Sequence, residues 1–155
     1  MGYDFFLDRN RLNSKFIEAD FFDPSSELAQ YDGQFDLLYA GSFLHLFGWS
    51  QQVAACKRMV SVLRPTPGAL LVGRQIGSSI PGEYRHQAGD EGVMYRHDIA
   101  SFKRMWKSVG KETGTEWDVE GVLRAIEMPG PLAANNNPTW SSRVVKRLYF
   151  TVRRK

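Results

Sequence analysis

Apolar residues recur at helical spacing between Ser50 and Leu63, and polar residues face elsewhere on the same segment, namely Gln51, Gln52, Lys57, Arg58 and Ser61. The apolar stripe consists of Val53, Cys56, Val60 and Leu63. A period of about 3.6 residues predicts an amphipathic helix, and Pro65 is placed to end it. Nearly continuous apolar runs flank this helix at residues 35–40 and 69–73. Such short runs are typical of buried parallel strands, so this part of the chain predicts a strand–helix–strand unit with a right-handed crossover.

A second helix and two further strands are predicted in the C-terminal half. Asp98 is a good N-cap, and an apolar stripe follows it at helical spacing. The stripe consists of Ile99, Phe102, Trp106 and Val109. We expect this helix to end at Gly110, because glycine is common at helix C-termini. Residues 115–123 and 143–153 predict two neighbouring strands, which is typical of an antiparallel pair at the end of a parallel sheet.

The remaining segments are shorter or less regular. Residues 3–12 predict a short helix, Lys15–Asp20 a short strand that ends in an acid, and Pro24–Gln30 a turn or short helix. The glycine-rich segment 74–96 and the proline-containing segment 127–142 predict irregular loops. Loops that follow strands often carry binding residues, so both are candidates for contacting a ligand.

The composition is that of one globular domain covering residues 1–155. Of the 155 residues, 43% are hydrophobic and 24% are charged, which is not the composition of a disordered chain. The net charge of +3, from 20 basic and 17 acidic residues, is too balanced to favour nucleic acid as a partner. Cys56 is the only cysteine, so we expect neither an intrachain disulfide nor a cysteine-based zinc site, and the spacing of the three histidines does not suggest a metal site either. No apolar run is long enough to span a membrane and no signal peptide is recognisable, so we expect a cytoplasmic protein.

The most informative stretch for function follows the first apolar run. The small residues Ala40, Gly41 and Ser42 end that run, and an aromatic turn containing His45 comes next. Ligands of open α/β sheets bind beyond the carboxyl ends of strands, and small residues there let a flat ligand approach the backbone. His45 would then lie at the mouth of a cleft. A core strand followed by a tight turn with a packed histidine is the simpler interpretation, and it stays open on these residues alone.

Several short phrases occur in an order that resembles a known family. They are Ala19–Asp23, Phe35–Asp36, Phe43–Phe47, Leu63–Pro65, Gly73–Gln75, Gly114–Trp117 and Phe150–Arg154. In this order the chain resembles class I S-adenosylmethionine-dependent methyltransferases, and more closely the fungal type that modifies polyketides and meroterpenoids. The resemblance implies an α/β fold with an incomplete Rossmann-like sheet, mostly parallel, with an antiparallel C-terminal strand pair and helices on its faces. The strand order of the family is 3-2-1-4-5-7-6.

One part of the family pattern is missing. No glycine-rich turn of the G-x-G-x-x-G kind precedes Asp20. The chain therefore looks like an N-terminally truncated member that starts just before the third strand and comprises the C-terminal portion of the fold. The strand at Lys15–Asp20 would lose its neighbours, and the strand at 35–40 would have a bare edge. Bare apolar edges pair with other chains, so we expect a homo-oligomer through this exposed sheet edge.

The resemblance also implies cofactor-binding residues. Asp20 would accept a hydrogen bond from the adenine amino group of S-adenosyl-L-methionine, and Phe21 would contact the base. Ala40 and Gly41 would lie against the cofactor. A solvated acid, a core phenylalanine and a turn of small residues are the alternatives that the sequence leaves open.

On the substrate side, His45 is the catalytic candidate. It would orient the accepting oxygen of a small molecule together with Arg74 or Gln75, and Trp117 would line the pocket. A hydrogen-bonded turn histidine and a packing tryptophan remain alternatives. The implied reaction is methyl transfer to a carboxylate or hydroxyl of a polyketide- or terpenoid-derived secondary metabolite. The competing hypothesis is a cofactor-free remnant that serves as a binding or interaction module, or as an isomerase or cyclase using the old substrate pocket.

Overall fold

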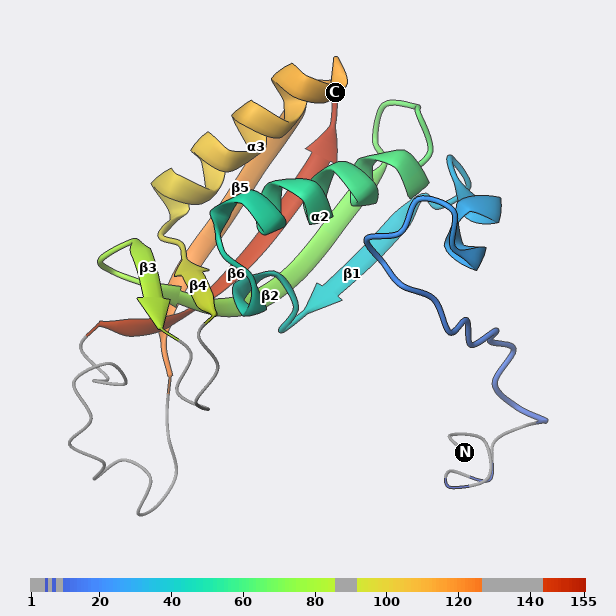
Figure 1. Cartoon of the computed structure of the whole chain (residues 1–155), viewed down its shortest axis with the longest axis horizontal. Helices are drawn as coiled ribbons and strands as arrows, with labels where there is room; N and C mark the ends of the chain where they lie inside the picture. Colours follow the sequence, from blue (N-terminus) through green and yellow to red (C-terminus); the bar gives the residue numbers. More distant parts are fainter. Residues whose placement is uncertain (1–4, 6, 8–9, 86–91, 127–143) are drawn as a thin grey trace.

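The computed structural model describes residues 5, 7, 10–85, 92–126 and 144–155. Its centre is a four-stranded mixed sheet with the strand order β1-β2-β6-β5 (Figure 1). The strands are β1 (Leu37–Gly41), β2 (Leu70–Ser78), β5 (Trp117–Ala125) and β6 (Val145–Arg154). Two long helices, α2 (Trp49–Val62) and α3 (Ile99–Thr113), pack against each other and against the sheet. The predicted α/β fold is confirmed.

The strands follow the arrangement that the family resemblance implied. β1 pairs with β2 in parallel, from Leu37 opposite Leu70 to Gly41 opposite Arg74. α2 connects these two strands, which confirms the strand–helix–strand unit. β6 lies between β2 and β5 and is antiparallel to both. The order therefore reproduces the 4-5-7-6 part of the family sheet. The resemblance implied a mostly parallel sheet. In the described part only the pair of β1 and β2 is parallel, because the other two pairs both contain the antiparallel strand β6.

Both long helices cover the same face of the sheet. Leu148, Phe150 and Val152 of β6 are buried, whereas the residues between them are exposed, because successive side chains of a strand point to opposite faces. The buried face joins α2 and α3 in one hydrophobic core. Cys56 of α2 belongs to this core, where burial raises the pKa of its thiol, as expected for a small buried hydrophobe. On the other face, no helix of the described chain covers the exposed side chains of Tyr39 and Tyr149.

The helix α3 begins with a capping box at the predicted N-cap. The Asp98 carboxylate accepts a hydrogen bond from the Ser101 backbone amide at 2.7 Å, and the Ser101 hydroxyl accepts one from the Asp98 amide at 3.1 Å. The predicted end at Gly110 is wrong, because the helix continues to Thr113 and is capped by Gly114 with φ +65°. Gly110 is instead needed for close packing, since a β-carbon there would lie 2.5 Å from the carbonyl oxygen of Thr115.

Replacing Asp98 by alanine is expected to lower the free energy of unfolding by about 1 kcal/mol, because the Ser101 amide loses the carboxylate that accepts its hydrogen bond. Asp98→Asn keeps a side-chain oxygen that can accept from the Ser101 amide, so it should retain most of the stability. Urea denaturation of the three proteins measures the difference. If the asparagine variant loses as much free energy of unfolding as the alanine variant, Asp98 does not stabilise the protein through its helix cap.

Two segments differ from the sequence predictions. Lys15–Asp20 forms no strand in the described chain, because no neighbouring strand offers it hydrogen-bonding partners. The expected loop at 74–96 instead contains the end of β2 and a two-stranded antiparallel sheet of β3 (Gly82–Arg85) and β4 (Val93–Arg96). The predicted turn or short helix near Pro24–Gln30 is a 3-10 helix, η1 (Glu27–Tyr31). The loop at 127–142 and most of the helix at 3–12 lie outside the described residues.

Candidate functional site

An apolar pocket of about 380 Å³ lies along β1, between Phe35 before the strand and Phe43 after it. It is lined by Phe21, Leu28, Phe35, Leu38, Tyr39, Ala40, Gly41, Phe43, Met59, Val62 and Leu71. Three of the four residues assigned to the cofactor from the sequence thus meet in one cavity: Phe21, Ala40 and Gly41. Phe21 comes from a segment well before β1 in the chain, whereas Ala40 and Gly41 are the last two residues of that strand. At its Ala40–Gly41 end the pocket reaches the carboxyl end of β1, which is the end of the strands at which open α/β sheets bind ligands.

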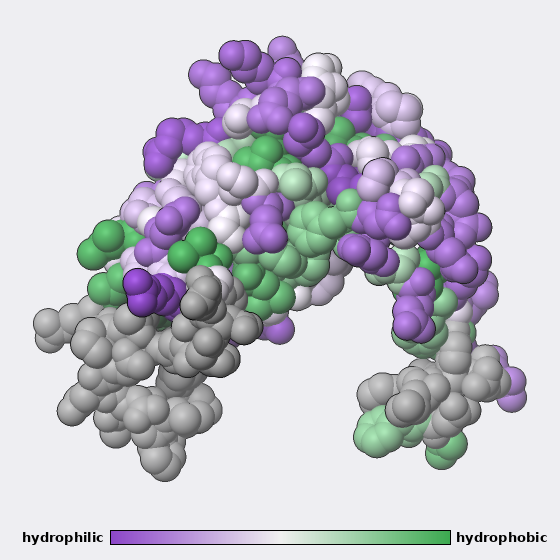
Figure 2. All heavy atoms as spheres, in the orientation of Figure 1, coloured by the Kyte–Doolittle hydropathy of each residue, from purple (hydrophilic) through white to green (hydrophobic). Residues whose placement is uncertain are grey.

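Edge-to-face aromatic contacts hold the N-terminal segment over this pocket. The ring of Phe21 lies 5.3 Å from that of Phe43, and the ring of Phe22 lies 5.1 Å from that of Phe47. Phe43 and Phe47 flank the 3-10 helix η2 (Leu44–Leu46), which directly follows β1. Figure 2 shows hydrophobic side chains gathered around η2 and the carboxyl end of β1. The four phenylalanines therefore fix the wall of the pocket without any regular strand in residues 15–23.

The turn between β1 and η2 has an unusual backbone. Ser42 adopts a left-handed conformation with φ 57°, which costs energy for a residue other than glycine. Its amide donates to the carbonyl oxygen of Arg74 at 2.7 Å and so ties the turn to β2. Such conformations persist where the surroundings fix them, and they concentrate at functional sites. The sequence gives no signal for this strain, because Ser42 is an ordinary turn residue.

Asp20 lies next to the pocket rather than in its wall. The side chain is exposed, and its Oδ1 accepts a hydrogen bond from the Phe22 amide at 2.9 Å. This bond is an Asx turn that sets the direction of the chain as it delivers Phe21 to the pocket. A carboxylate at this rim can still accept from an amine of a bound ligand, because it has more acceptor sites than this bond uses.

His45 lies in η2, half-buried, two residues after the pocket residue Phe43. Leu44 anchors η2 in the core at 1% exposure. The buried amide of Gln52 fixes the same turn from α2, because its Nε2 donates to the carbonyl oxygens of Phe47 at 2.9 Å and Tyr95 at 2.8 Å. His45 is therefore held on a rigid turn that follows β1, and it does not line the apolar pocket.

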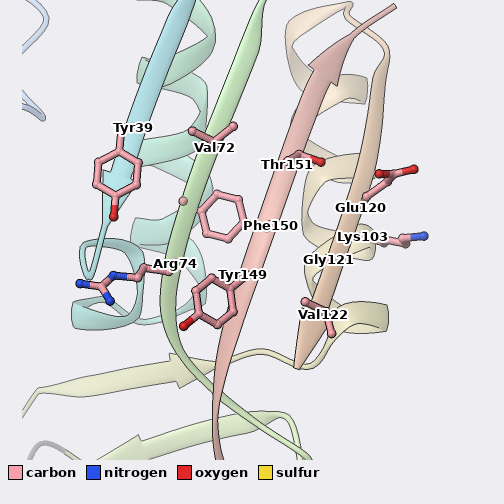
Figure 3. A pocket seen from close by; sticks show the side chains of 11 residues that line it. Tyr39, Val72, Arg74, Lys103, Glu120, Gly121, Val122, Tyr149, Phe150 and Thr151 are labelled. Atoms are coloured by element: carbon pink, nitrogen blue, oxygen red, sulfur yellow. The ribbon is translucent and has the colours of Figure 1, made fainter. Parts of the chain in front are cut away.

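Arg74 and Gln75 point to opposite faces of β2, so the structure separates the two residues that were expected to act together. Gln75 faces the helices and is 2% exposed, and neither atom of its amide has a hydrogen-bond partner in the described chain. Arg74 is exposed on the uncovered face. There it lies between Tyr39 of β1 and Tyr149 of β6, in a broad groove of about 780 Å³ (Figure 3). The two tyrosines are missed by the sequence reasoning, although the alternation along β1 and β6 could have placed them beside Arg74.

Trp117 lies at the opposite end of the sheet from the other candidates. It begins β5 and pairs with Arg154, close to where β2 begins. Its indole Nε1 donates to the Thr115 hydroxyl at 2.6 Å, and its ring packs 5.3 Å from that of Trp106. These contacts are those of a packing tryptophan, and the structure does not bring Trp117 to the pocket beside β1.

His97 is buried on the helix side, next to the N-cap of α3. Its Nδ1 is 2.9 Å from the Ser101 hydroxyl, and the rings of Tyr95 and Phe102 lie 4.6 Å and 5.5 Å away. Desolvation lowers the pKa of His97 to about 3, so the imidazole is neutral at physiological pH. A fully buried neutral histidine with these partners is a packing residue at the start of α3.

The described residues contain no group of three or more histidine, cysteine or acidic side chains that could hold a metal ion. None of the helices in the described ranges is long and apolar enough to cross a membrane.

Known proteins with similar sequences are fungal methyltransferases, although no family model matches the chain. The O-methyltransferase phiE from Fungal sp. (strain ATCC 74256) is 40% identical over 163 residues, which cover 99% of this chain and 54% of that protein. The O-methyltransferase atr3 from Stereocaulon alpinum is 39% identical, over 79% of this chain and 36% of that protein. The asnovolin E/chermesin D methyltransferase nvfJ from Aspergillus novofumigatus is 30% identical, over 77% of this chain and 43% of that protein. The chain spans about half the length of these relatives, or less.

Solved structures show the same fold at low sequence identity. The [4+2]-cyclase SpnF matches with a TM-score of 0.60 at 13% identity, over 98% of this chain and 60% of that protein. The Burkholderia thailandensis 1,6-didemethyltoxoflavin-N1-methyltransferase, solved with S-adenosylhomocysteine, matches with a TM-score of 0.53 at 15% identity, over 80% of this chain and 45% of that protein. By sequence the chain is therefore similar to fungal O-methyltransferases over about half of their length or less, and its Rossmann-like fold is shared with these two solved structures.

Proposed function

We propose that this chain takes part in S-adenosyl-L-methionine-dependent methyl transfer to an oxygen of a polyketide- or terpenoid-derived secondary metabolite. The observation that carries the proposal is the pocket in which Phe21, Ala40 and Gly41 meet beside the carboxyl end of β1. The names of the sequence relatives support the chemistry, since two of them are O-methyltransferases. A carboxylate or a hydroxyl group is the proposed acceptor.

The pocket fits the adenine end of the cofactor. Its wall combines the ring of Phe21 with the small side chains of Ala40 and Gly41, and a flat apolar base needs both a ring to pack on and room beside the backbone. Asp20 at the rim supplies an acceptor for an exocyclic amine. When bound, the cofactor supplies a methyl group on a positively charged sulfur. The residues of this chain that we assign to it are Asp20, Phe21, Ala40 and Gly41.

The substrate side needs positioning more than proton transfer. A carboxylate is already ionised near pH 7, so the chain does not have to remove a proton from it. The role we assign to His45 is to orient the accepting oxygen from the rigid turn η2, because methyl transfer depends on alignment of the reacting atoms. Arg74 carries a permanent charge on the uncovered face and suits an anionic part of the substrate. For Gln75 and Trp117 a substrate contact stays a prediction, and their positions in the described chain favour packing.

Titration calorimetry of the 155-residue chain with S-adenosylhomocysteine tests the proposal. We expect saturable binding that Phe21→Ala weakens about tenfold or more, because loss of a stacked ring costs roughly 1–3 kcal/mol. Val122→Ala is the matched control, since Val122 is exposed on the opposite edge strand β5 and should leave binding unchanged.

The absence of binding by a folded sample would contradict the cofactor assignment. The cofactor-free alternative, a binding module or a cyclase or isomerase that uses the same pocket, would then take its place. Equal weakening by both variants would show that the phenylalanine acts only through the stability of the fold.

The partners we propose are a small-molecule substrate and further copies of the chain, associated through a sheet edge, with a cytoplasmic location. The net charge of +3 gives no reason to add nucleic acid.

A further inference from the structure

Gln52 is a polar side chain in the apolar interior of the protein, where none of its surface is exposed. Both hydrogens of its amide are used, because Nε2 donates to the carbonyl oxygens of Phe47 at 2.9 Å and Tyr95 at 2.8 Å. The amide oxygen Oε1 has no hydrogen-bond partner in the part of the chain that the structure describes. A buried acceptor without a partner lowers stability, and natural proteins accept such losses mainly at functional sites. This indicates a role in geometry rather than in stability alone.

The two carbonyl groups that this amide joins belong to different parts of the fold. Phe47 ends the turn η2, whereas Tyr95 lies in β4. The Tyr95 backbone amide also donates to the Phe47 carbonyl oxygen at 2.9 Å, so this oxygen accepts two hydrogen bonds. Gly48 packs closely on β4, because a β-carbon there would lie 3.3 Å from Cγ2 of Val93. The ring of Trp49 lies 5.0 Å from that of Tyr95. The turn η2, the strand β4 and the start of α2 are thus fixed to one another.

Aromatic rings connect the same turn to the candidate cofactor pocket. The ring of Phe47 lies 5.2 Å from that of Phe43, which lines the pocket. The ring of Phe43 in turn lies 5.3 Å from that of Phe21 in the same wall. His45 lies in η2, between Phe43 and Phe47 in the chain. A displacement of Phe47 would therefore move both the pocket wall and the histidine that we assign to the substrate.

We propose that Gln52 is a positioning residue, whose amide locks η2 against β4 and so keeps His45 and the rings of the pocket wall in place for ligand binding. The identity of the ligand rests on the proposed function, whereas the lock is present in the chain without a ligand. Glutamine suits this role because its amide offers two donors and no charge. A carboxylate would offer no donor, and an ammonium group would bring a charge into the interior. The lock also makes β4 part of the scaffold of the site, although the described residues of the pocket wall come from other elements.

Hydrogen exchange of the Gln52→Met variant tests the lock, because methionine has a similar length and offers no donor. The Tyr95 amide reports on the lock, since it donates to the Phe47 carbonyl oxygen. The Val152 amide reports on global stability, because β6 lies between β2 and β5 in the sheet. We expect exchange at Tyr95 to accelerate at least about tenfold more than exchange at Val152, since loss of the lock opens η2 and β4 locally.

Val60→Ala is the matched control. Val60 is a buried apolar residue of the same helix and offers no hydrogen bond to either carbonyl group, so its truncation should lower global stability without accelerating Tyr95 more than Val152. The NMR signal of the His45 ring, assigned by its loss in His45→Gln, should shift in Gln52→Met and stay in place in Val60→Ala. In titration calorimetry, S-adenosylhomocysteine should bind Gln52→Met about fivefold or more weakly than the wild type, and it should bind Val60→Ala as tightly as the wild type.

Equal acceleration of exchange at Tyr95 and Val152 in Gln52→Met would overturn the proposal, because Gln52 would then act only through global stability. An unmoved His45 signal in this variant would overturn it as well, and so would an unchanged affinity for S-adenosylhomocysteine where the wild type binds it. If Gln52→Met does not fold, Gln52→Asn replaces it, since its side chain is one methylene shorter and does not reach both carbonyl groups. A wild type that does not bind S-adenosylhomocysteine contradicts the proposed function, and the exchange and His45 measurements then decide on the lock by themselves.

Discussion

Gly73→Val is expected to lower the free energy of unfolding by about 3 kcal/mol or more, enough to unfold most of the protein. Gly73 lies in the middle of the sheet, opposite Ala40 of β1 and Phe150 of β6. A β-carbon at this position would collide with the carbonyl oxygen of Ala40 and with the ring of Phe150. The ring cannot move away easily, because it is buried and packs 4.7 Å from the ring of Phe102.

Gly82→Val is the matched control for this substitution. Gly82 begins β3, and a β-carbon there would meet nothing within 4 Å. Since valine is favoured in strands, we expect a change within about 0.5 kcal/mol. Guanidinium denaturation followed by tryptophan fluorescence compares the two variants. Similar midpoints for both would mean that the close approach of Phe150 to β2 is not needed for stability.

The stability of the protein should fall steeply below pH 6.5 because of His97. Burial lowers the pKa of His97 to about 3 in the folded chain, whereas the unfolded chain binds the proton near the ordinary value of 6.5. Between these two values the unfolded state holds more protons than the folded state, so stability rises with pH. The contribution of neutral His97 to the free energy of unfolding is fully present above pH 6.5. It is lost as the pH falls toward 3, by roughly 1.4 kcal/mol for each pH unit.

The comparison of wild type with His97→Gln isolates this contribution. Glutamine does not titrate, so the free energy of unfolding of the variant should vary less between pH 4 and pH 7 than that of the wild type. At pH 7 the variant should be less stable than the wild type, because the contact with Ser101 changes. Urea midpoints at several pH values measure both slopes. Asp98 also has a lowered pKa, since its bonds to Ser101 and nearby Arg104 and His97 outweigh desolvation, and it is present in both proteins. Equal slopes would contradict the burial of a neutral His97.

The periodic parts of the chain were predictable, and the parts that depend on tertiary contacts were not. α2 and α3 follow from their apolar stripes, and the antiparallel pair of β5 with β6 follows from two neighbouring strand patterns. The pair of β3 and β4 was missed, because each strand has only four residues, and β3 begins with glycine and carries two charged side chains. The strand expected at Lys15–Asp20 was wrong for a different reason. A strand needs a neighbour, and sequence pattern alone does not say whether one is present.

Positions in the candidate site could be predicted from the sequence where strand order and the alternation of side chains along a strand determine them. Phe21 and Gly41 line one pocket, as the family resemblance implied, although residues 15–20 form no strand and the contact of Phe21 with Phe43 holds it there. The separation of Arg74 from Gln75 could also have been foreseen, since adjacent residues of a strand face opposite sides.

The central position of β6 has a consequence for how the chain acquires its structure on the ribosome. Synthesis delivers β1, α2, β2, α3 and β5 before β6 (Figure 1). Until β6 emerges, β2 and β5 share no hydrogen bonds and each keeps an open edge. The sheet can therefore close only when this late strand inserts between two earlier ones. Nascent chains that stall before residue 145 should be sensitive to proteases and should recruit chaperones that bind extended apolar segments.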